Sequence, residues 1–112
     1  MGNMAEHDWQ VLRKIAHTAL ERYCRKTLDL VEEVLRSTHA SDHGKYLDLY
    51  GLLQKRDKAM ADAFSDIRRS QGETQLAMLV SMGLVNSGEL AEFSENLRAK
   101  IKVLLGDSLA SK

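Results

Sequence analysis

Side chains that could do chemistry are few in this chain of 112 residues, which has four histidines and one cysteine. His39 and His43 are four residues apart, a spacing at which two imidazoles on one helix face can bind zinc. They lie in a polar segment, residues 37–44, that is typical of a loop. No histidine has a glutamate three residues before it, as the di-iron helical bundles require. We therefore expect no metal site and no cofactor.

Covalent catalysis has equally little support. The sequence contains no G-x-S-x-G, no S-x-x-K and no glycine-rich phosphate loop. Glu32 and Glu33 are adjacent, and on a helix they point in different directions, which favours a solvated face over a paired acid and base. Cys24 stands in a helical stretch, where a small buried hydrophobe is the favoured interpretation; the neighbouring Arg25 and Lys26 leave a reactive thiol open. We expect a protein that is not an enzyme.

Charge interrupts one of the apolar stripes. Within residues 42–70 the helical period requires an apolar residue at position 56 or 57, where the chain has Arg56 and Asp57. A structural salt bridge between this segment and residues 5–37 is the favoured interpretation, and a functional polar site is the alternative. Arg56 and Asp57 are therefore candidate site residues at the helix seam.

Helices must position these residues. A composition with no proline, 44% hydrophobic and 5% aromatic residues favours helix over strand. Apolar residues recur at steps of three and four, and polar or glycine-containing breaks divide the chain. We predict a single all-α domain, a helical bundle. It consists of a long antiparallel helical hairpin, residues 5–37 and 42–70, two shorter C-terminal helices, 71–83 and 87–105, and a frayed tail, 106–112.

The apolar stripes of the two long segments are wide. In the first segment one row consists of Trp9, Leu12, Ala16, Ala19, Tyr23, Thr27, Leu30 and Val34. A second row consists of Ile15, Leu20, Cys24, Leu28, Val31 and Leu35. The face of the second segment consists of Tyr46, Leu49, Tyr50, Leu53, Met60, Phe64 and Ile67. Two helices alone cannot cover faces of this breadth, so we expect a homodimer.

Local capping signals organise the C-terminal part of the chain. Gly83 followed by Leu84 is typical of a left-handed helix C-cap. Asn86 with Glu89 three residues later has the pattern of a capping box, which would start the helix at 87–105. Ser94 could divide that helix into two pieces.

Residues 75–101 also have the order of elements of a helix-turn-helix, the motif with which many regulators bind DNA. The second helix would begin with Glu89, Glu92 and Glu95, which repel phosphates. The chain has 16 Lys+Arg against 16 Asp+Glu, so it has no broad attraction to nucleic acid or to an anionic membrane. A DNA-binding transcriptional regulator is therefore the alternative function.

The favoured function is protein–protein interaction. The longest apolar run, residues 76–80, is about a quarter of a membrane span, and a single cysteine excludes a disulfide framework. We expect a cytoplasmic, non-enzymatic interaction or regulatory protein that presents a helix face to a protein partner of unknown identity. The candidate partner-binding residues are Met60, Phe64, Met78 and Met82. Methionine is adaptable at binding surfaces, although gap-filling in the core is the favoured role for these methionines.

Overall fold

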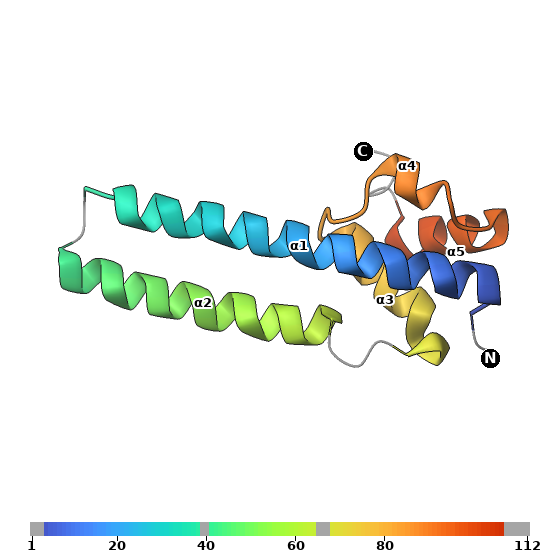
Figure 1. Cartoon of the computed structure of the whole chain (residues 1–112), viewed down its shortest axis with the longest axis horizontal. Coiled ribbons are helices and arrows are strands. Elements are labelled where there is room, and N and C mark those ends of the chain that lie inside the picture. Colours follow the sequence, from blue (N-terminus) through green and yellow to red (C-terminus); the bar gives the residue numbers. More distant parts are fainter. Residues whose placement is uncertain (1–3, 39–40, 65–67, 107–112) are drawn as a thin grey trace.

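The structure, a computed structural model, describes residues 4–38, 41–64 and 68–106. Its helices are α1 (Glu6–Arg36), α2 (Asp42–Phe64), the short 3-10 helix η1 (Arg69–Gln71), α3 (Gly72–Ser81), α4 (Ser87–Leu90) and α5 (Glu95–Leu105) (Figure 1). No strand occurs among these residues. The predicted fold class is confirmed: the chain is all-α, with a long antiparallel helical hairpin followed by shorter C-terminal helices.

The molecule is elongated, with principal extents of 52 × 29 × 20 Å. The reason is the length of α1, a continuous helix of 31 residues, whose N-terminal half lies against α3 and α5 while its C-terminal half pairs with α2 (Figure 1). We call the described parts of residues 4–23 and 59–106 the head, and the described part of residues 24–58 the stalk. The C-terminal half of α1 therefore extends beyond the short C-terminal helices (Figure 1).

The hydrophobic core lies entirely in the head. The largest fully buried side chains are those of Leu12, Tyr23, Leu76, Leu79, Leu84 and Ile101. Between Tyr23 and Ala63, by contrast, no described side chain is buried. The difference follows from coverage, because a helix pair alone cannot shield a wide apolar face, whereas several helices surround the N-terminal half of α1.

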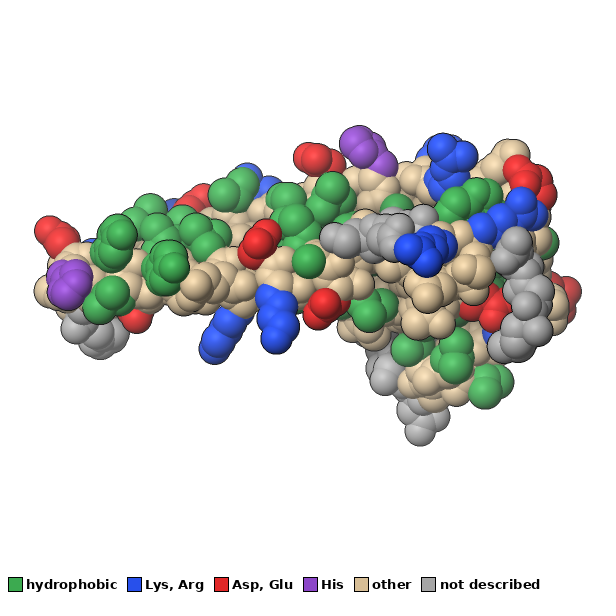
Figure 2. Space-filling view, turned by 90° about the horizontal axis from the view of Figure 1, so that it is seen from below, with side chains coloured by type: hydrophobic (Ala, Val, Ile, Leu, Met, Phe, Trp, Pro, Cys, Tyr) green, Lys and Arg blue, Asp and Glu red, His purple; other side chains and the backbone are tan. Residues whose placement is uncertain are grey.

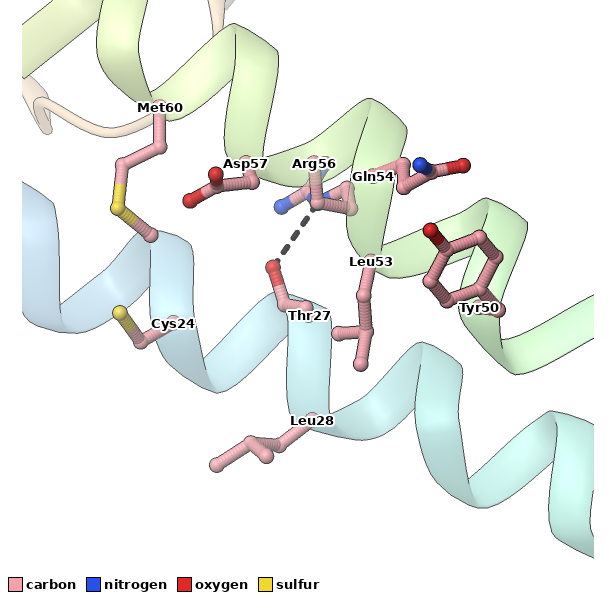
Figure 3. A pocket seen from close by; sticks show the side chains of 9 residues that line it. All are labelled: Cys24, Thr27, Leu28, Tyr50, Leu53, Gln54, Arg56, Asp57 and Met60. Carbon is pink, nitrogen blue, oxygen red and sulfur yellow. Dashed lines mark hydrogen bonds between the residues drawn. The ribbon is translucent and has the colours of Figure 1, made fainter. Parts of the chain in front are cut away.

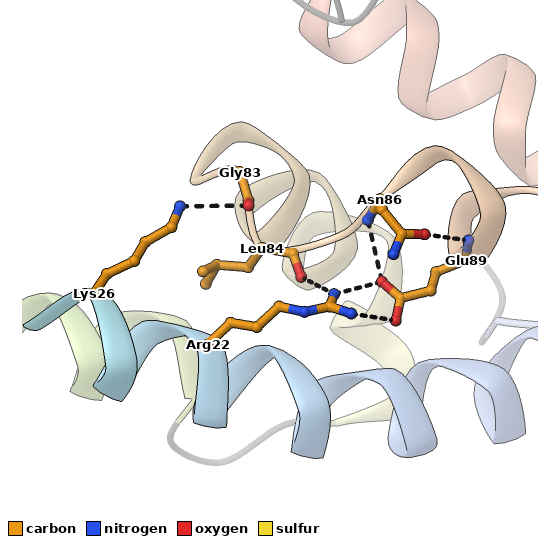
Figure 4. A network of polar contacts seen from close by, with 6 residues as sticks. All are labelled: Arg22, Lys26, Gly83, Leu84, Asn86 and Glu89. Carbon is orange, nitrogen blue, oxygen red and sulfur yellow. Dashed lines mark hydrogen bonds and ion pairs between the residues drawn. The ribbon is translucent and has the colours of Figure 1, made fainter.

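A polar network joins the middle of α1 to the turn between α3 and α4 (Figure 4). The Arg22 guanidinium donates to the Leu84 carbonyl at 2.8 Å and to the two carboxylate oxygens of Glu89 at 2.5 and 2.9 Å. Glu89 also accepts from the backbone N–H of Asn86, whose side chain accepts from the Glu89 backbone N–H. The predicted capping box is thus confirmed. Gly83, at φ 73°, forms the predicted left-handed cap of α3.

The helix predicted over 87–105 is divided at Ser94, the alternative that the sequence left open, because the chain turns between α4 and α5. Ser94 is the N-cap of α5, with its hydroxyl accepting from the Leu97 backbone N–H at 3.3 Å. The buried Asp8 of α1 accepts from the Ser94 backbone N–H at 2.7 Å and from its hydroxyl at 2.6 Å. This contact holds the turn that directs α5 back onto α3, where Leu97 and Ile101 are buried.

The second long helix is shorter than the predicted 42–70. α2 ends at Phe64, and Arg68 has an extended backbone before η1. The Gln75 side-chain amide satisfies one carbonyl of the last turn of α2 by donating to Ala63 at 3.1 Å. Arg69 anchors the next segment to the start of α1 through the Met4 carbonyl at 2.7 Å. Ile67 lies outside the described residues.

The remaining boundaries agree with the prediction to within two residues. α1 and α3 occupy Glu6–Arg36 and Gly72–Ser81, against the predicted 5–37 and 71–83. α5 ends as predicted at Gly106, which has φ 57°. The rest of the predicted tail lies outside the described residues.

Glu89→Gln should lower the free energy of unfolding at pH 7 by about 1–2 kcal/mol, because it removes the charge from the bonds to Arg22. The hydrogen bonds from Arg22 lower the pKa of Glu89. Its contribution is therefore complete above the unfolded-state pKa and is lost as the pH falls through the lower folded-state pKa. Urea unfolding should show the gap between wild type and variant closing as the pH is lowered below about 4.5, the ordinary pKa of a glutamate.

The matched control is Glu73→Gln, which removes the exposed ion pair between Glu73 and Lys100 at 3.2 Å. It should change stability by less than about 1 kcal/mol at either pH, since exposed ion pairs contribute little. A gap between wild type and Glu89→Gln that persists unchanged in acid would contradict the assignment.

Candidate functional site

Arg56 lies at the seam between the two helices of the hairpin. Its guanidinium donates to the Thr27 hydroxyl at 2.9 Å (Figure 3) and to the Tyr23 carbonyl at 3.3 Å. The guanidinium carbon lies 3.9 Å from the centroid of the Tyr23 ring, in a cation–π contact. In return the Tyr23 hydroxyl donates to the Arg56 carbonyl at 2.6 Å. These contacts join α1 to α2 where the stalk meets the head.

The prediction of a salt bridge at this seam is wrong, because Arg56 binds neutral acceptors on α1. Asp57 is exposed and forms no ion pair with another described residue. The reason is the geometry of a helix, in which consecutive side chains point about 100° apart. Arg56 therefore faces α1, while Asp57 lies at the edge of a groove beside the seam (Figure 3).

This groove runs between α1 and α2 and has a volume of about 540 Å³. Its apolar lining consists of Cys24 and Leu28 on α1 with Tyr50, Leu53 and Met60 on α2. Thr27, Gln54, Arg56 and Asp57 supply the polar atoms. Figure 3 shows the Cys24 and Met60 side chains at one end of the groove and Tyr50 at the other.

The groove belongs to a larger apolar surface along one side of the stalk, which we call the hairpin face. It consists of the groove residues Cys24, Leu28, Tyr50, Leu53 and Met60 together with Val31, Leu35 and Tyr46, which follow them at helical steps of three and four on the same faces of α1 and α2. Among the large side chains of this face, Leu28 is 52% exposed, Leu35 56%, Tyr46 67% and Tyr50 58%. Figure 2 shows hydrophobic side chains gathered over this half of the molecule. Its α1 residues come from the second apolar row of the sequence.

The other side of the stalk is charged. A second depression there is lined mainly by Lys26, Asp29, Glu33 and Arg36. The stalk therefore has one apolar and one charged side, although neither helix has a buried residue within it. Exposed apolar surface of this extent is typical of sites that bind another polypeptide.

The four predicted partner-binding residues are not brought together. Met60 lines the groove, whereas the Phe64 ring meets the Tyr23 ring edge-on at 6.0 Å and packs against the core. Met78 and Met82, near the end of α3, are half-buried against the core of the head. Sequence reasoning did not single out Leu28, Tyr46, Tyr50 or Leu53 as binding residues, although all four stand in the apolar rows it identified.

The other sequence candidates are distributed over the molecule. Cys24 is a half-buried free thiol at the groove. His39 lies outside the described residues, so the structure does not place the His39 and His43 pair. Within the described part of the chain no group of three potential metal ligands occurs. None of the described helices is long and apolar enough to cross a membrane.

In the helix-turn-helix-like segment 75–101, the helix after the Gly83 turn is α4, which has only four residues. The longer α5 starts after a further turn at Ser94. α5 also carries a second apolar patch, where Val103 is 81% and Leu104 61% exposed.

Arg56→Ala should lower the free energy of unfolding by about 1–2 kcal/mol, because it removes two hydrogen bonds and the contact with the Tyr23 ring. Lys58→Ala is the matched control, an exposed residue two positions along α2, and should change stability by less than about 0.5 kcal/mol. Urea unfolding followed by circular dichroism measures both. Equal effects of the two substitutions would contradict the role of Arg56 in joining α1 to α2.

Comparison of the chain with protein-family models, curated proteins and solved structures found no match.

Proposed function

We propose that this protein is a non-enzymatic interaction protein that binds another polypeptide through its hairpin face. The observation that carries the proposal is the exposed apolar surface of a stalk that has no buried core of its own. Burying apolar surface is the dominant favourable contribution to protein association. A second polypeptide on the hairpin face would cover the apolar surface of the stalk, as the short C-terminal helices cover the N-terminal half of α1.

The shape of the surface favours a helix as the bound element. The groove is open along the stalk, and the exposed residues of both helices recur at steps of three and four. An amphipathic helix docks by inserting residues of the same spacing into such a groove. The lining of the groove includes one thiol and one carboxylate but no histidine, which supports binding over nucleophilic catalysis. A free thiol at Cys24 is compatible with a cytoplasmic location.

The double substitution Leu28→Glu/Tyr50→Glu tests the proposal, because both side chains are more than half exposed and their loss leaves the core intact. Association should weaken at least about 100-fold, since each buried apolar side chain contributes about 1.5–3 kcal/mol. The measurement is amine crosslinking of the tagged chain in native cell extract. Wild type should give a species larger than the monomer, and the double variant only the monomer.

The matched control is Val103→Glu/Leu104→Glu, which places the same charges on the exposed apolar patch of α5. This variant should keep the crosslinked species, and circular dichroism should show equal helix content in all three proteins. A crosslinked species that survives Leu28→Glu/Tyr50→Glu, or a wild type that gives only monomer, would refute the proposal.

A further inference from the structure

We draw no further inference here: the strongest candidate, the apolar hairpin face along the stalk with the groove between α1 and α2, belongs to the site already described, and nothing in the structure shows whether a second copy of this chain or another polypeptide covers it.

Discussion

The structure depends on one physical constraint, which is how much of α1 the other helices are long enough to cover. This helix has 31 residues, whereas α3, α4 and α5 have 10, 4 and 11. The short helices can surround only its N-terminal half, and the core forms there because side chains from several helices exclude water. Beyond Lys26, α2 is the only neighbour of α1 among the described residues, so the second apolar row stays exposed there. The division into head and stalk is therefore a consequence of helix lengths.

Polar residues of α1 determine how the short helices are placed on it. Asp8 binds the N-cap residue of α5, while Arg22 and Lys26 bind carbonyls in the turn that follows α3. These contacts satisfy backbone groups that helix ends leave without partners, so the ends can lie against α1 without a desolvation penalty. Arg22 binds Glu89 as well, which joins the ion pair to the capping box of α4. One helix thus supplies both the apolar core and the polar contacts that orient its neighbours.

The seam between α1 and α2 shows how adjacent residues can have opposite roles. Arg56 joins the helices through Tyr23 and Thr27, while Asp57 lies at the edge of the groove. The cation binds neutral acceptors and an aromatic ring, so no second charge needs to be desolvated beside it. The carboxylate next to it is then available to a partner on the hairpin face.

The sequence by itself determined the helical class, the hairpin and the local caps. Gly83, Asn86 and Glu89 act as predicted because a cap depends only on residues within a few positions of it. Periodicity also identified two apolar rows on the first helix. It could not show which row would be covered, because that depends on the helices packed against it.

Only the tertiary structure decided that the helices predicted over 87–105 and 42–70 break, and which residues form the site. Asp8 meets Ser94 across 86 positions of sequence, and Gln75 meets Ala63 across 12, so the local pattern at 87–105 and 42–70 held no sign of either contact. Met60 lies in the groove and Met78 lies against the head for the same reason. A periodic pattern reports which face of a helix is apolar, whereas burial depends on the neighbours that the whole fold brings to that face.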